Sequence, residues 1–122
     1  MRRFKTILTL AALALMALLV IRCGTENPLQ PGRGDNEVWI QASGYDPTEL
    51  TVTVGTNVTW TNKDATGHTV TSGTPNNVST DFTSSPLTLT QGETHSVTFS
   101  KRGRFPYFCT QHRSKLGTIV VQ

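Results

Sequence analysis

Two imidazoles and one thiol could meet at a single metal ion in this chain. Cys109 and His112 are separated by two residues, so a tight loop could bring the thiolate and the imidazole to one centre, and His68 lies far upstream. One thiolate and two imidazoles in a trigonal arrangement are typical of blue copper sites, and the same donors can also bind zinc. The residue types therefore predict a metal site, and the spacing alone does not fix the metal.

The cysteine content favours a thiolate ligand over a disulfide. The chain has two cysteines, and Cys23 stands at the end of an apparent export signal, which leaves Cys109 alone in the folded part. An unpaired cysteine is unusual in an exported protein because oxidising compartments favour disulfides. Metal ligation would explain Cys109, and a buried structural thiol is the alternative.

Short alternating segments, rather than helices, must position these side chains. Apolar residues alternate with threonines in 50–54, and Val97 and Phe99 share one face of 94–99. The expected strands are 38–40, 50–54, 58–61, 68–71, 87–89, 94–99, 104–109 and 118–121. We expect 72–85 to be mostly loop, and Pro106 to bend its strand or mark an edge. Seven to eight short strands predict an all-β Greek-key β-sandwich.

The first 22 residues have the pattern of a secretory signal peptide. Three basic residues precede the apolar run 7–21, which as a helix would span roughly 22 Å, short of the ~30 Å core of a bilayer. The end of the run resembles a bacterial lipobox, so Cys23 is the expected lipidation site, although Arg22 replaces the usual small residue. Residues 23–36 are the expected flexible tether and 37–122 the folded domain. We therefore expect a periplasmic or cell-envelope protein with a lipid anchor.

The charge of the domain gives no support for nucleic-acid binding. The formal net charge is +3, but four basic residues belong to the N-terminal signal, which leaves seven basic and eight acidic residues from Cys23 onward. Five of these seven gather late in the sequence and are either solvated charge or a docking patch for an acidic redox partner. They are Lys101, Arg102, Arg104, Arg113 and Lys115.

Over roughly Trp39 to Val121 the chain resembles the plastocyanin, amicyanin and pseudoazurin family of cupredoxins. The stretches that carry the resemblance are 45–52, 58–70, 102–112 and 117–121. The resemblance implies a single mononuclear copper site with ligands at His68, Cys109 and His112. It also implies that the edge of the His112 ring is the port for electrons.

One position departs from the family pattern. Short-loop members have Cys-x-x-His-x-x-Met-x-Gly, and Lys115 stands here in the place of the axial methionine. An ammonium cannot ligate copper, and deprotonating it would require a large depression of its pKa. We therefore expect Lys115 to turn outward, leaving a three-coordinate site or one with a weak contact from water or the Gly67 carbonyl.

The leading hypothesis is a type 1 (blue) copper protein that carries single electrons between exported or membrane redox partners. The partner would be a cytochrome, an oxidase or a reductase, and the protein would be a monomer. Copper sequestration or delivery is one alternative, because Lys115 replaces the axial methionine. A metal-free or zinc-binding Ig-like interaction domain is another. Catalysis is not expected, because three histidines are too few for a multicopper oxidase.

Overall fold

The computed structural model describes residues 32–122, and the predicted signal peptide, Cys23 and most of the tether lie outside this range. The described chain contains strands and no helix, hence no helix that could cross a membrane. The strands are β1 (Glu37–Gln41), β2 (Gly44–Asp46), β3 (Glu49–Val52), β4 (Thr56–Asn62), β5 (Thr71–Thr74), β6 (Asn77–Val78), β7 (Thr94–Phe99), β8 (Gly103–Phe108) and β9 (Leu116–Val121). The predicted all-β class is confirmed.

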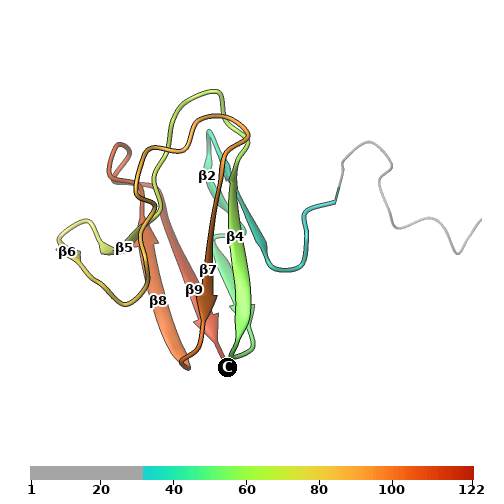
Figure 1. Ribbon diagram of the computed structural model, residues 1–122. Coiled ribbons are helices and arrows are strands. Elements are labelled where there is room, and N and C mark those ends of the chain that lie inside the picture. Colours follow the sequence, from blue (N-terminus) through green and yellow to red (C-terminus); the bar gives the residue numbers. More distant parts are fainter. Residues whose placement is uncertain (1–31) are drawn as a thin grey trace, which may run out of the picture. The chain divides into compact units, whose positions relative to one another are not determined.

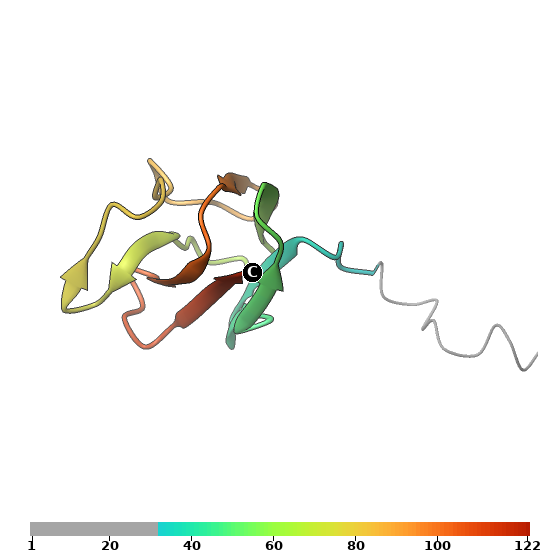
Figure 2. The same ribbon diagram turned by 90° about the horizontal axis from the view of Figure 1, so that it is seen from below.

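Two mixed sheets build this unit (Figure 1, Figure 2). One has the order β2-β1-β4-β7 and the other the order β3-β9-β8-β5-β6. In the first sheet β1 runs parallel to β4, and in the second β3 runs parallel to β9, whereas the remaining pairs are antiparallel. Because β5 pairs with β8, with Thr71 opposite Phe108, the segment just before β5 lies beside the segment just after β8. This pairing brings residues near 68 close to residues near 109.

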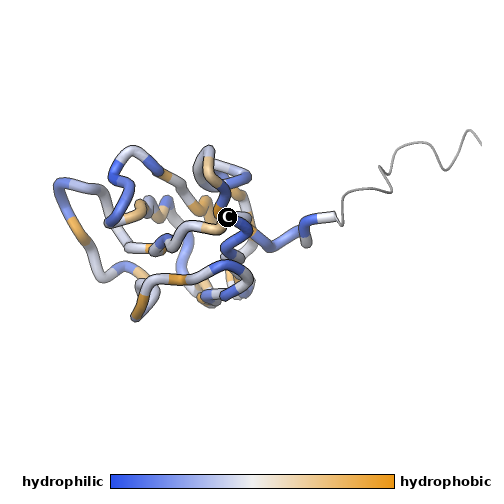
Figure 3. Tube along the Cα trace, turned by 90° about the horizontal axis from the view of Figure 1, so that it is seen from above, coloured by the Kyte–Doolittle hydropathy of each residue, from blue (hydrophilic) through white to orange (hydrophobic). Residues whose placement is uncertain are grey.

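The core lies between the sheets and follows the alternation read from the sequence. In β7 the residues at 94, 96 and 98 are exposed, whereas Val97 and Phe99 are buried and His95 is half-buried on their face. Trp60 in β4 is fully buried and packs edge-on against Tyr107 of β8, with ring centroids 5.3 Å apart. Figure 3 shows hydrophobic residues interspersed among hydrophilic ones along the chain. Burial of these rings supplies much of the favourable free energy of folding.

Two expectations about strands were wrong. The segment 68–71 is not a strand, because only His68 forms an isolated bridge, with Leu89, and β5 begins at Thr71. The segment 72–85 is mostly loop, as expected, and also holds β6 and all of β5 except Thr71. Residues 87–89 contribute that single bridge and no strand. Runs of serine and threonine have no clear apolar alternation, so long-range pairing rather than local pattern decides these boundaries.

The strand with Pro106 lies inside its sheet and not at an edge. Pro106 pairs with Thr118 of β9 on one side of β8. On the other side β5 pairs only with Tyr107 and Phe108, so no described strand pairs with Pro106 there. A residue that lacks an N–H can occupy this position because the pairing of β5 with β8 ends at Ser72 and Tyr107 and does not reach it.

Candidate metal centre

His68, Cys109 and His112 come together at one end of the sandwich. One ligand atom from each lies within 4.8 Å of the others. The Cys109 Sγ atom is 3.8 Å from Nδ1 of His68 and 3.7 Å from Nδ1 of His112. His68 and Cys109 are fully buried, whereas His112 is half-buried. The structure thus gathers the three residues that the sequence singled out, with one of them near the surface.

A carboxylate orients His68. The Oδ2 atom of Asp64 lies 2.7 Å from Nε2 of His68. Since a carboxylate can only accept, Nε2 carries the proton, and Nδ1 presents its lone pair toward Cys109. This hydrogen bond to His68 also holds the pKa of Asp64 below its usual range.

The buried side chain of Asn62 shapes the turn that carries Asp64. Its amide nitrogen donates to the carbonyls of Thr66 at 2.9 Å and Leu89 at 2.8 Å, and its Oδ1 accepts from the N–H of Asp64 at 2.9 Å. Sequence reasoning missed both Asn62 and Asp64. The available signal was the Asn-x-Asp sequence at 62–64, which ends four residues before the candidate ligand, since such side chains bond their own backbone.

Thr69, which directly follows His68, forms hydrogen bonds to the sulfur of Cys109. Its N–H donates to Sγ at 3.4 Å, and its hydroxyl lies 3.9 Å from the same atom. The hydroxyl oxygen also accepts the N–H of Thr110 at 2.9 Å, while the hydroxyl of Tyr45 donates to the Thr69 carbonyl at 2.6 Å. An N–H aimed at the sulfur stabilises a thiolate, which is the form that binds a metal.

Lys115 stands in the position of the axial methionine, but its side chain forms its hydrogen bond outside the cluster of His68, Cys109 and His112. Its ammonium donates to the carbonyl of Ala42, in the turn between β1 and β2. In the described chain no hydrogen bond joins this ammonium to His68, Cys109 or His112. Gly67 directly precedes His68, and a Cβ there would lie 2.5 Å from Cγ2 of Thr88, so this position accepts only glycine without a shift. A copper contact from the Gly67 carbonyl stays a prediction.

The five basic residues near Cys109 in the sequence do not lie around one point. Lys101, Arg102 and Arg104 stand at the start of β8, whereas Arg113 and Lys115 follow its end (Figure 1). A strand of six residues separates the two groups by about 20 Å. Arg104 forms an ion pair with Glu49 at 2.8 Å, so part of this charge is compensated within the chain.

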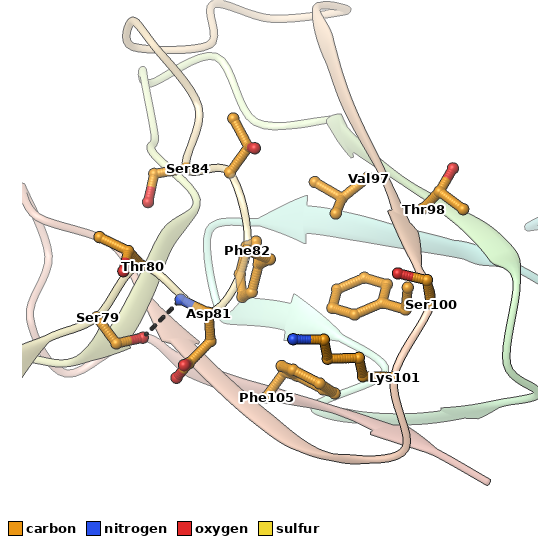
Figure 4. Close-up of a pocket in the computed structure, with 12 residues that line it drawn as sticks. Ser79, Thr80, Asp81, Phe82, Ser84, Val97, Thr98, Ser100, Lys101 and Phe105 are labelled. Atoms are coloured by element: carbon orange, nitrogen blue, oxygen red, sulfur yellow. Dashed lines mark hydrogen bonds between the residues drawn. The ribbon is translucent and has the colours of Figure 1, made fainter.

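A separate pocket of about 500 Å³ opens beside β7. Figure 4 shows it between the segment that carries Asp81 and Phe82 and the segment that carries Ser100 and Lys101. None of the three clustered residues lines it. The candidate donor atoms belong to His68, Cys109 and His112, which lie elsewhere, so this pocket is not the candidate metal centre.

Comparison with known proteins agrees with this geometry. Residues 34–122 match the model of the family described as copper binding proteins, plastocyanin/azurin family. The chain belongs to this family. It is 34% identical over 89 residues to amicyanin-alpha of Methylorubrum extorquens, which covers 73% of each chain.

Solved cupredoxin structures are similar as well. A purple cupredoxin from Nitrosopumilus maritimus is 30% identical with a TM-score of 0.64, covering 70% of this chain and 98% of that one. A methionine-to-lysine mutant of oxidised amicyanin is 31% identical with a TM-score of 0.64, covering 76% of this chain and 87% of that one. The cupredoxin fold of this chain is therefore shown independently of its metal site.

The donor set fits the metal of the family. A buried thiol and two imidazoles, with the Nδ1 atoms of both rings near the sulfur, match the ligand types that copper takes in type 1 sites. Asp64 fixes the outer nitrogen of one ring, as is usual for metal-binding histidines. Copper is the cofactor that the family and this donor set specify.

Proposed function

We propose that this protein carries single electrons between exported or membrane redox partners, with His68, Cys109 and His112 holding one copper ion. The observation that carries the proposal is the convergence of three donor atoms within 4.8 Å. Bound copper supplies a one-electron couple between Cu(II) and Cu(I). Membership of the copper-binding plastocyanin/azurin family and the similarity to amicyanin-alpha support this role.

The residues around the cluster suit such a role. Buried His68 and Cys109 are held by Asp64 and Thr69, so their donor atoms keep their places without the metal. His112 is half-buried, so its ring offers a short path between the site and a docked partner. Donors held in advance by the fold need little rearrangement when the charge of the site changes.

Visible absorption and electron paramagnetic resonance of the copper-loaded protein test the proposal. We expect an intense thiolate-to-copper band and a type 1 signal, both abolished by Cys109→Ser and retained in the matched control Thr110→Ser. A colourless wild-type protein that takes up no copper would refute it. The same spectra of a His112→Gly variant should change if His112 is a ligand.

Copper sequestration or delivery is the second candidate, and one observation favours it. Lys115 stands where short-loop cupredoxins have methionine, and its ammonium bonds a backbone carbonyl. The axial ligand tunes the redox potential of type 1 sites, so its loss could leave a site that holds copper without relaying electrons. A reversible redox titration with rapid reduction by a small donor supports electron transfer, and a site that stays in one oxidation state supports sequestration.

We also propose that the protein is exported and anchored to the membrane by a lipid on Cys23, with Arg113 and Lys115 nearest the docking surface of an acidic partner. The basic and apolar pattern of residues 1–22 supports export. Fractionation and mass spectrometry of the full-length protein test this: lipidation predicts a membrane-bound product with acylated Cys23, and Cys23→Ala should release it. An intact, unacylated N-terminus would contradict the anchor.

A further inference from the structure

The loop that joins β8 to β9 is tied to both sheets by its two cationic side chains. The ammonium of Lys115 donates to the carbonyl of Ala42, beside the four-stranded sheet. The Nη2 atom of Arg113 donates to the carbonyl of Pro75 at 2.8 Å, beside the five-stranded sheet. Neither residue has a carboxylate partner in the described chain. Both cationic side chains of this loop therefore donate hydrogen bonds to backbone carbonyl oxygens.

The two acceptors hold equivalent positions in their turns. Ala42 directly follows Gln41, which pairs with Gly44, and Pro75 directly follows Thr74, which pairs with Asn77. Each is thus the first residue of a two-residue hairpin turn. The carbonyl at this position is outside the paired ladder and is free to accept from a side chain, and a hydrogen bond from a charged donor is stronger than a neutral one.

The backbone of Lys115 is bonded to both candidate ligands of the loop. Its N–H donates to the carbonyl of His112 at 2.8 Å, and its carbonyl accepts the N–H of Cys109 at 3.2 Å. Once the Lys115 side chain is anchored on Ala42, these two bonds transmit its position to His112 and Cys109.

His112 depends on such support more than His68 does. Asp64 fixes the outer nitrogen of His68, but in the described chain no hydrogen bond reaches Nε2 of His112. Its ring is half-buried, so core packing holds it only in part. The position of this ring therefore follows from the loop backbone that carries it.

We propose that Lys115 and Arg113 are positioning residues that fasten the loop 109–116 across the two sheets and so keep His112 beside Cys109. This inference rests on the proposed function only in so far as His112 binds copper. It gives the lysine in the axial-methionine position a structural role in place of ligation.

Amide hydrogen exchange of the copper-free, full-length protein tests the fastening without any metal. We expect Lys115→Ala to speed exchange of the hydrogen-bonded loop amides of Cys109, Thr110 and Lys115 by about tenfold, and Arg113→Ala to do so by about threefold. Lys115→Arg, which keeps a charged donor, should restore slow exchange. Lys101→Ala is the matched control, because this exposed lysine at the other end of β8 has no hydrogen bond in the described chain. Amides of β7 report whether each variant is folded.

A second measurement concerns the metal. Release of Cu(I) to a chelator from the reduced protein should be about tenfold faster in Lys115→Ala than in wild type, and the thiolate-to-Cu(II) band of the oxidised protein should be unshifted. Loop exchange within twofold of wild type in Lys115→Ala would overturn the proposal, as would faster exchange with unchanged copper release. A shifted band with unchanged exchange would make Lys115 a ligand and would also overturn it. If wild type binds no copper, the proposed function fails, and the copper-free exchange still decides the fastening.

Discussion

The carboxylate of Asp64 lies 2.7 Å from Nε2 of His68, four residues further along the chain. Because His68 is 1% exposed and Asp64 reaches toward the surface, the pair links the buried donor to the loop that follows β4. The contact sets which ring nitrogen carries the proton and leaves Nδ1 for the metal. A residue outside the candidate ligand set therefore determines how one candidate ligand presents its free nitrogen.

Replacing Asp64 should weaken copper binding without removing a ligand. In Asp64→Asn the side-chain oxygen can still accept from Nε2 of His68, but the negative charge beside the ring is lost. We expect copper affinity to fall by about tenfold to a hundredfold, with a larger loss in Asp64→Ala. Competition with a chromophoric chelator measures it, and Asp81→Asn, at an exposed acid away from the cluster, is the control. Equal affinity in all variants would contradict the role assigned to Asp64.

Thr69 should contribute to stability through its hydroxyl. In Thr69→Val the N–H of Thr110 loses its acceptor, which lies 2.9 Å away, while the shape of the side chain is kept. A partly buried donor left unpaired costs about 1–3 kcal/mol. Chemical denaturation of the copper-free protein should show this loss, and Thr69→Ser, which retains the oxygen, should recover most of it. A serine variant as unstable as the valine variant would point to lost packing of the methyl group instead.

The sequence identified the three clustered residues because cysteine and histidine are scarce in this chain and their surroundings resemble a known family. It did not identify Asp64, since a carboxylate in an irregular loop has no periodicity to mark it. The acceptors at Ala42 and Pro75 are backbone atoms, and nothing in a residue type indicates them. The interior position of β8 was likewise hidden, because it depends on the pairing of β5 with Tyr107 and Phe108 and not on Pro106 itself. Local alternation thus predicted the class of fold, whereas long-range pairing decided edges and supporting contacts.

Gly117 should tolerate no side chain. It pairs with Tyr107 across β8 and β9, and a Cβ at this position would overlap the ring and hydroxyl of Tyr107. Because Tyr107 is 1% exposed and packs against Trp60, its ring has no free space to enter. We expect Gly117→Ala to lower the free energy of unfolding by about 1–3 kcal/mol through overpacking. Gly34→Ala, where the nearest atoms of Glu37 would lie 3.7 Å away, should change it little. Thermal or chemical denaturation compares the two, and equal stabilities would contradict the predicted overlap.

The carboxylate of Glu37 should make a small, pH-dependent contribution to stability. Partial burial raises the pKa of Glu37, but the hydrogen bonds donated by the Thr61 hydroxyl and the Gly34 N–H outweigh it and hold the pKa below its ordinary value of 4.5. A group whose pKa is lowered on folding stabilises the native state above its unfolded pKa, and this stability is lost as the pH falls through the folded value. Wild type should therefore be more stable than Glu37→Gln at pH 7, by about 0.5 kcal/mol because the site is largely solvated, and the gap should close on acidification below about pH 4. Urea denaturation of both proteins across this range measures the gap, and other titrating groups cancel in the difference. A gap that stays constant or widens in acid would mean that Glu37 acts through packing and not through its charge.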